Sequence, residues 1–263
     1  MLAICNGMPR SGSTLLYNVA RTLIAVASDG EAHGFVTSDK AHGCYCSPET
    51  LDAWAASPVW HVVKTHEVLD RSGDLLDRGA RILYIYRDVR DVAVSMKRAF
   101  SHRGEKLMSA IERALGYYAA LDELRGHREA KVHWCRYEEV YADLPAAIEA
   151  CDAFLGLNAS PGQLAAVHEQ CRVESAETMT ANARGHLARM LQEASPERAD
   201  EIRDQVRDRG WLVGDFLLHH HHISPQRGAP GSWEGSLTAD EIHAIPDRFA
   251  DLLAARGYTT QPA

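Results

Sequence analysis

Short apolar runs alternate with longer amphipathic stretches through the first half of the chain. The apolar runs cover residues 1–7, 59–64, 80–86 and 131–135, and each has the length of a buried strand. Buried strands that alternate with helices predict an α/β fold, in which helices flank a parallel β-sheet as a three-layer sandwich. No repeat, linker or low-complexity segment interrupts the pattern, so we expect a single domain over residues 1–263.

The second half of the chain carries helix-start signals. Serine–proline pairs stand at 160–161 and 195–196, and Thr238 with Glu241 forms a capping-box pattern. We therefore expect a helical second half. The segment 173–193 lacks strong periodicity, and we expect it to form a flexible lid over a bound substrate.

A small, polar segment follows the first strand. Residues 8–16 join that strand to a helical pattern, and the turn contains Arg10, Gly12 and three hydroxyl residues, Ser11, Ser13 and Thr14. Free N–H groups at a helix start and the positive end of its dipole favour anions. The segment indicates a phosphate cradle, although a plain turn with serine N-caps fits as well. An ATP-type loop would need a second glycine and a lysine, which are absent here.

A second basic segment follows the strand at 80–86. Arg87 stands at the carboxyl end of this strand, and Ser95 lies about two helical turns further on. The charges at 87–91 could pair among themselves. However, the carboxyl ends of parallel strands share one edge of a sheet, so we expect a second anion site beside the first.

Five segments in this chain resemble those of one family, the sulfotransferases that use 3′-phosphoadenosine 5′-phosphosulfate (PAPS). Residues 8–16 are similar to the 5′-phosphosulfate loop, and Tyr84, Arg87, Asp91 and Ser95 are similar to the 3′-phosphate signature. The further matches are 63–66 to the Lys-Thr-His segment, 136–139 to the Arg-Tyr-Glu-Asp segment, and 226–233 to the late glycine-rich segment. The resemblance is to the cytosolic and bacterial type and implies a P-loop-like fold.

The resemblance implies transfer of a sulfuryl group from PAPS to a hydroxyl or amine of a small-molecule acceptor, without a metal. Lys64 and Arg10 would neutralise the leaving phosphate and the sulfuryl oxygens. His66 is our candidate general base, because imidazole is largely neutral near pH 7 and faces the same side of an extended segment as Lys64. The implied nucleotide-binding residues are Arg10, Ser11, Gly12, Ser13, Thr14, Leu15, Arg87, Ser95, Tyr137, Gln226, Arg227 and Gly228.

Several alternatives stay open. Glu31 is a rival base, since sulfotransferases that act on protein tyrosine and on heparan use a glutamate about one helix after the loop. Leu15 replaces the usual tryptophan, so adenine stacking is expected to depend more on Tyr137. A kinase of the P-loop class and a catalytically silent nucleotide-binding protein are the competing functions.

The net charge and the lengths of the apolar runs limit the kinds of partner expected for this chain. A net charge of −8 argues against nucleic acid, and no run approaches the roughly 18 apolar residues of a membrane span. The first predicted strand leaves no room for a signal peptide, so we expect a cytoplasmic protein with its six cysteines reduced.

The histidine tract 219–222 is expected in a mobile loop rather than at a metal, because four consecutive side chains cannot converge on one ion. A homodimer is one option for the assembly, and secondary metabolism is one setting.

Overall fold

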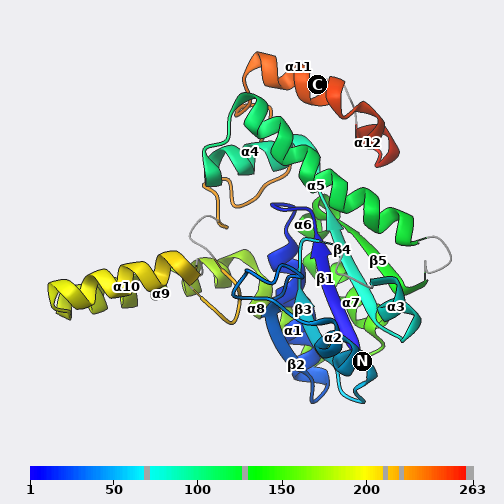
Figure 1. Ribbon diagram of the computed structural model, residues 1–263. Helices are drawn as coiled ribbons and strands as arrows, with labels where there is room; N and C mark the ends of the chain where they lie inside the picture. The colour runs from blue at the N-terminus through cyan, green and yellow to red at the C-terminus, as the bar shows by residue number, and fades with distance from the viewer. Residues whose placement is uncertain (68–71, 126–129, 210–212, 219–221, 259–263) are drawn as a thin grey trace.

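Five parallel strands form one sheet in the order β2-β3-β1-β4-β5 in the computed structural model, which describes residues 1–67, 72–125, 130–209, 213–218 and 222–258 (Figure 1). The strands are β1 (Leu2–Gly7), β2 (Glu31–Phe35), β3 (His61–Lys64), β4 (Arg81–Tyr86) and β5 (Val132–Arg136). The predicted parallel sheet is confirmed, and the four predicted strands are β1, β3, β4 and β5. The sequence did not reveal β2, since this edge strand has no buried residue and contains Gly34 at a positive φ.

Helices cover both faces of the sheet, which confirms the three-layer prediction. They are α1 (Ser13–Ala27), α2 (Pro48–Ala56), α3 (Ser72–Asp77), α4 (Val89–Phe100), α5 (Gly104–Arg125), α6 (Tyr137–Ala142), α7 (Leu144–Leu155), α8 (Pro161–Cys171), α9 (Val173–Glu193), α10 (Pro196–Arg209), α11 (Ala239–Arg248) and α12 (Ala250–Ala255). None of the helices in the described part of the chain is long and apolar enough to cross a membrane.

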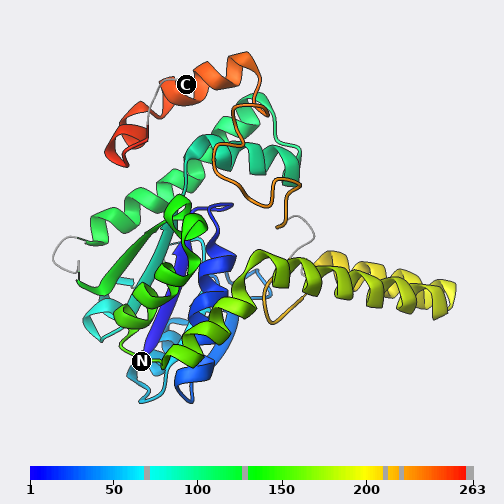
Figure 2. The same ribbon diagram turned by 180° about the vertical axis from the view of Figure 1, so that it is seen from behind.

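The strands divide their side chains between two cores. Leu2 and Ile4 of β1 pack in one buried cluster with residues of α2 to α5, α11 and α12, whereas Ala3 and Cys5 pack in the other with α1, α7 and α8. This alternation follows the two-residue period of a strand buried on both faces. Figure 2 shows α1, α7 and α8 on the second face.

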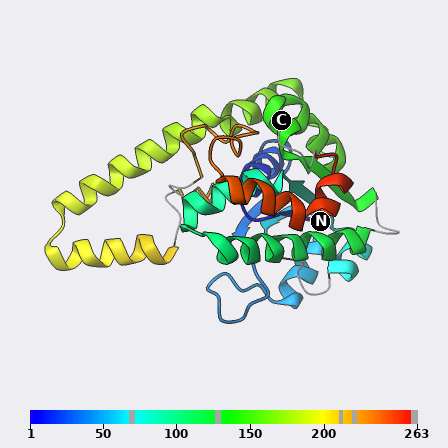
Figure 3. The same ribbon diagram turned by 90° about the horizontal axis from the view of Figure 1, so that it is seen from above.

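The segment 173–193 is fully helical. It forms the continuous 21-residue helix α9, which projects from the body beside α10, and its role as a lid stays a prediction (Figure 3). Thr180 is the one residue of α9 that is buried, so a mostly solvated helix has no apolar stripe to reveal it. The predicted helix starts are confirmed: capping boxes at Ser160 and Thr238 open α8 and α11, and α10 begins at Pro196.

The parallel register brings the ends of the strands together. Cys5 pairs with Lys64, Gly7 with Ile85, and Tyr86 with Arg136, so these four strands end at one edge of the sheet. The polar segments that follow β1, β3, β4 and β5 therefore lie side by side. The expectation that they share one site rests on this geometry.

Candidate active site

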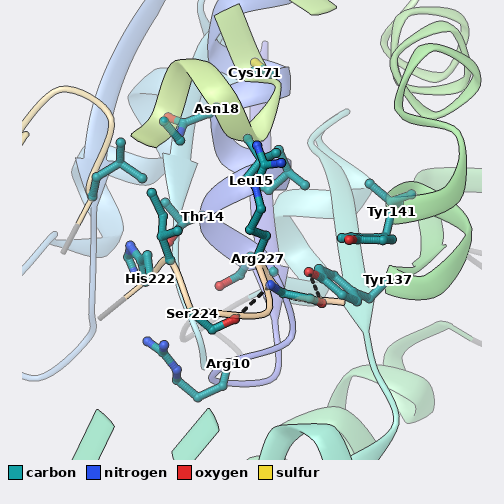
Figure 4. A pocket seen from close by; sticks show the side chains of 18 of the residues that line it. Arg10, Thr14, Leu15, Asn18, Tyr137, Tyr141, Cys171, His222, Ser224 and Arg227 are labelled. Atoms are coloured by element: carbon teal, nitrogen blue, oxygen red, sulfur yellow. Dashed lines mark hydrogen bonds between the residues drawn. The ribbon is translucent and has the colours of Figure 1, made fainter. Parts of the chain in front are cut away.

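A cavity of about 750 Å³ opens at the carboxyl edge of the sheet. The loop after β1 and the start of α1 form its floor, and side chains from α4, α6, α8 and α9 form its walls (Figure 4). All the polar segments predicted from the sequence contribute to it. Among the predicted residues, the lining includes Arg10, Gly12, Ser13, Thr14, Leu15, Lys64, His66, Arg87, Ser95, Tyr137, Gln226, Arg227 and Gly228.

The loop after β1 presents backbone N–H groups to the cavity. Helix α1 begins at Ser13, and its N-cap Gly12 has a φ of 95° and makes no side-chain capping bond. The first-turn N–H groups are thus left to a ligand, and the helix dipole adds partial positive charge. The alternative of a turn closed by serine N-caps is wrong for this segment.

The Ser11 side chain supports the loop. It is fully buried, and the hydroxyl bonds to the carbonyl oxygens of Met8 at 2.7 Å and Ile85 at 2.9 Å. The hydroxyl therefore ties the loop to β4, and a part for Ser11 in nucleotide binding stays a prediction.

Lys64 and His66 lie together beneath the cavity. Lys64 Nζ is 3.0 Å from His66 Nε2, and His66 Nδ1 is 2.9 Å from the carbonyl oxygen of Gly7. Because a carbonyl can only accept, Nδ1 carries the proton and Nε2 presents its lone pair to Lys64. The Gly7 carbonyl thus sets the tautomer that a general base at Nε2 requires.

Burial and positive neighbours depress the pKa of both groups. Burial, followed by the charges of Lys64 and Arg10, lowers the pKa of His66 to about 3. Burial lowers the pKa of Lys64 to about 7. The neighbouring Cys5 acts to raise this pKa, and the positive charge of Arg10 acts to lower it. At neutral pH His66 is therefore neutral, and Lys64 is divided between its two forms.

Three arginine side chains surround the cavity. Arg10 Nε donates to Ser95 Oγ at 2.9 Å, and burial together with the charges of Arg98 and Arg87 lowers the pKa of Arg10 to about 10. Burial and Arg87 likewise lower the pKa of Arg98. Three guanidinium groups around one cavity indicate a place for an anion.

Arg98 is a cavity residue that was not predicted from the sequence. Arg98 follows Ser95 by three positions and Asp91 by seven, which is the spacing of one helix face. Following the helix face of Asp91 and Ser95 one turn further along α4 would have predicted Arg98. Ser95 accepts its hydrogen bond from Arg10, which comes from the loop after β1.

Asp91 anchors the late glycine-rich segment. Its side chain is 1% exposed and accepts hydrogen bonds from the N–H groups of Gly231 and Trp233 and from the Ser232 hydroxyl, at 2.9 to 3.1 Å. Arg87 Nη2 lies 3.3 Å from the same carboxylate. Asp91 therefore orients Arg87 and joins α4 to a segment about 140 residues away.

Tyr137 packs among these elements instead of presenting an open ring face. Its ring centroid is 4.2 Å from the Arg87 guanidinium carbon, and its hydroxyl donates to the Gly228 carbonyl at 2.9 Å. A Cβ on Gly12 would lie 2.6 Å from the ring, and one on Gly228 would lie 2.4 Å from the hydroxyl. Both glycines have positive φ and make room for Tyr137. The ring, 8% exposed, supports Arg87, so the expected role in adenine stacking is not visible in this arrangement.

The late segment reaches the cavity through Arg227 and Gly228. The Gly228 carbonyl also accepts from Arg87 at 3.0 Å, and its N–H donates to Ser224 Oγ at 2.8 Å. Arg227 lies at the rim, where its guanidinium binds the carboxylates of Glu174 and Glu177 on α9. These contacts place α9 against the late segment (Figure 4). His222 lines the cavity, whereas the rest of the histidine tract, 219–221, lies outside the described residues.

The rival base lies at the other end of the sheet. Glu31 begins β2 and pairs in register with His61, the first residue of β3, whereas His66 follows the end of β3. Five residues of strand geometry correspond to about 16 Å. Glu31 does not line the cavity, so His66 is the base candidate within reach of it.

Comparison with known proteins gives the family. Residues 3–206 match the sequence model of the sulfotransferase domain. The chain belongs to this sulfotransferase family.

Individual relatives are distant. Sulfotransferase 4A1 of Homo sapiens is 26% identical over 178 residues, which cover 62% of this chain and 62% of the relative, and the Mus musculus protein of the same name gives the same values. The match thus spans less than two thirds of these relatives.

Among solved structures, mouse sulfotransferase SULT7A1 complexed with PAP has a TM-score of 0.60 at 14% identity and covers 96% of this chain and 84% of that chain. Retinol dehydratase in complex with androsterone and inactive cofactor PAP has a TM-score of 0.59 at 17% identity, covering 96% and 80%. At these identities the likeness shows the fold.

Replacing Asp91 tests the anchoring of the late segment. The variant Asp91→Ala should lower the free energy of unfolding by about 3–5 kcal/mol, because it leaves buried Arg87 and three loop donors without their carboxylate. Urea denaturation measures the loss. Asp200→Ala is the control, since the Asp200 side chain is 77% exposed and its pairing with Arg203 should contribute less than about 1 kcal/mol. Equal losses in the two variants would contradict the anchoring role of Asp91.

Proposed function

We propose that this chain moves the sulfuryl group of PAPS to a hydroxyl or amine of a small-molecule acceptor. When bound, PAPS supplies an activated sulfuryl group, whose bond to the 5′-phosphate breaks as the bond to the acceptor forms. The observation that carries the proposal is the cluster of Arg10, Arg87 and Arg98 beside the uncapped start of α1. The comparisons support a sulfotransferase and give no support to the kinase alternative.

The residues present fit a nucleotide with a phosphate at each end. Arg10, the N–H groups of Gly12 to Leu15 and Lys64 would hold the 5′ end. Arg87 and Ser95 would hold the 3′-phosphate, with Gln226, Arg227 and Gly228 from the late segment. Arg87 Nε supports this assignment, because it is buried and has no hydrogen-bond partner among the described residues.

Lys64 and His66 would act in sequence. In the structure Lys64 Nζ occupies the lone pair of His66 Nε2. An anion above Arg10 would attract Lys64, free Nε2 and raise the pKa of His66, because its negative charge offsets the cations that now lower that pKa. Nε2 could then take the proton of the acceptor while Lys64 and Arg10 stabilise the charge on the departing phosphate.

The acceptor would enter beside apolar side chains. Leu144, Met179, Phe216 and Leu217 contribute apolar surface to the cavity. This lining and the net charge of −8 favour a neutral or cationic small molecule over a polyanion. The same proposal includes a cytoplasmic location, a role in secondary metabolism and a homodimeric assembly. It also includes the absence of nucleic-acid and membrane partners.

Removal of His66 tests the base. The variant His66→Ala should reduce kcat by about 10²–10⁴-fold and change the affinity for 3′,5′-ADP much less, because the imidazole acts on the acceptor proton. Transfer from labelled PAPS to an accepted substrate measures the loss. His243→Gln, an exposed histidine on α11, is the matched control. Unimpaired turnover in His66→Ala together with loss in Glu31→Gln would assign the base to Glu31 instead.

The pKa of Lys64 gives a pH dependence for nucleotide binding. With a pKa of about 7 in the free protein, Lys64 is mostly neutral at pH 8.5, and a bound anion would raise that pKa. Binding of 3′,5′-ADP should therefore take up close to one proton at pH 8.5 and less at pH 6, where Lys64 already carries its proton. The affinity should fall by up to about tenfold per pH unit above 7.

Calorimetry in two buffers of different ionisation enthalpy measures this proton uptake. In Lys64→Met the uptake attributed to Lys64 should disappear. Equal uptake in the variant and the parent would contradict the assignment to Lys64.

Arg87 should confer preference for the 3′-phosphate. The parent should bind 3′,5′-ADP at least tenfold more tightly than 5′-ADP, and Arg87→Gln should remove most of that preference, because a charge-assisted contact contributes about 1.5–3 kcal/mol. Magnesium-free calorimetry measures the ratio. Arg113→Gln, on the exposed side of α5, is the matched control. Tight binding of ATP, with no preference for the 3′-phosphate, would favour the kinase alternative.

A further inference from the structure

Three potential metal ligands meet at the edge of the sheet opposite the cavity. Glu31 and His33 stand two positions apart on β2 and share one face of that strand. His61 begins β3 and pairs in register with Glu31. The parallel pairing of an edge strand with its neighbour thus brings two imidazoles and one carboxylate together.

The distances suit a single ion. His33 Nε2 is 2.8 Å from His61 Nδ1, and Glu31 Oε2 is 4.0 Å and 3.9 Å from these two nitrogens. Around a tetrahedral zinc ion the donor atoms stand about 3.3 Å apart, since each lies about 2.0–2.1 Å from the metal. Shifts of roughly half an ångström, mainly in the Glu31 side chain, would therefore bring the three atoms into coordination.

Neighbouring side chains pack against the two imidazole rings, and an ion could still reach them from solvent. Trp54 of α2 stacks on His33, with ring centroids 3.9 Å apart and planes 8° apart. The His61 side chain is 9% exposed and that of His33 is 21% exposed, whereas that of Glu31 is 67% exposed. The two rings are fixed by packing, and the carboxylate can turn toward an arriving ion.

The chemistry of the donor atoms also suits a cation. His33 Nε2 and His61 Nδ1 share one proton in their hydrogen bond at 2.8 Å, and the tautomers that move this proton to the far ring nitrogen would present both lone pairs to an ion. Two imidazole nitrogens and a carboxylate oxygen are the donor set that zinc and related divalent transition metals accept, with water in the fourth position.

We propose that Glu31, His33 and His61 bind one divalent transition-metal ion of the zinc class, which joins β2 to β3. The site lies outside the cavity, so the ion would take no part in group transfer. Its role would be structural, because β2 is an edge strand without a buried residue of its own. The competing interpretation is a simple hydrogen bond between the two histidines, with no affinity for metal.

Trp54 provides a local reporter for the test. The experiment uses the full chain with residues 219–222 replaced by serine, because that histidine tract would itself take up metal. Titration with Co²⁺, which quenches nearby indole emission, should give saturable quenching with one ion per chain, and Zn²⁺ should reverse it by competition. Trp54→Phe should lose most of the quenching while calorimetry still detects binding.

Ligand variants decide between the two interpretations. In Glu31→Gln and in His61→Gln the dissociation constant for Co²⁺ should rise at least tenfold, whereas His243→Gln should leave it unchanged. Glu31→Gln changes an exposed side chain and preserves its size, so it tests the site even if His61→Gln fails to fold. Equal affinity in Glu31→Gln and the parent, or no quenching in the parent, would overturn the proposal.

Thermal unfolding gives a second readout. Zn²⁺ at about 100 times its dissociation constant should raise the Tm of the parent, because an ion that binds only the folded chain stabilises it. The same concentration should leave the Tm of Glu31→Gln nearly unchanged. An equal rise in both proteins would place the ion elsewhere and overturn the assignment.

Discussion

The convergence of Arg10, Arg87 and Arg98 on one cavity is the constraint on which the rest of the site depends. Burial first, and neighbouring guanidinium charges second, disfavour the charged forms of Arg10 and Arg98 by lowering the pKa of each. Neighbouring structure offsets part of this cost: Ser95 accepts from Arg10, and Asp91 lies beside Arg87. In the proposed function, the phosphates of a doubly phosphorylated nucleotide would add negative charge beside these guanidinium groups.

Several residues of the family pattern make their polar or packing contacts with other parts of the protein. The Asp91 carboxylate accepts hydrogen bonds from the late segment, and the Ser11 hydroxyl ties the loop to β4. Tyr137 fills the space between Gly12 and Gly228. Their shared effect is to fix Arg87 and the start of α1 relative to each other. A pattern of side chains can therefore mark a site through the contacts that hold the site together.

The sequence was sufficient for the features that rest on strong local signals. Four strands are apolar on both faces, and their carboxyl ends had to share an edge, so the position of the cavity followed from topology. Strand β2 and helix α9 did not follow, because both are largely solvated and lack the apolar period that reveals an element. The contacts of Arg227 with α9 and of Tyr137 with Arg87 depend on long-range packing, for which the local sequence has no signal.

The most direct test of this account is a crystal structure of the chain with 3′-phosphoadenosine 5′-phosphate. The account predicts the 5′-phosphate at the start of α1 beside Arg10, the 3′-phosphate on Arg87 and Ser95, and Lys64 turned from His66 toward the anion. A nucleotide bound elsewhere, or one whose 3′-phosphate points into solvent while Lys64 stays on His66, would contradict it.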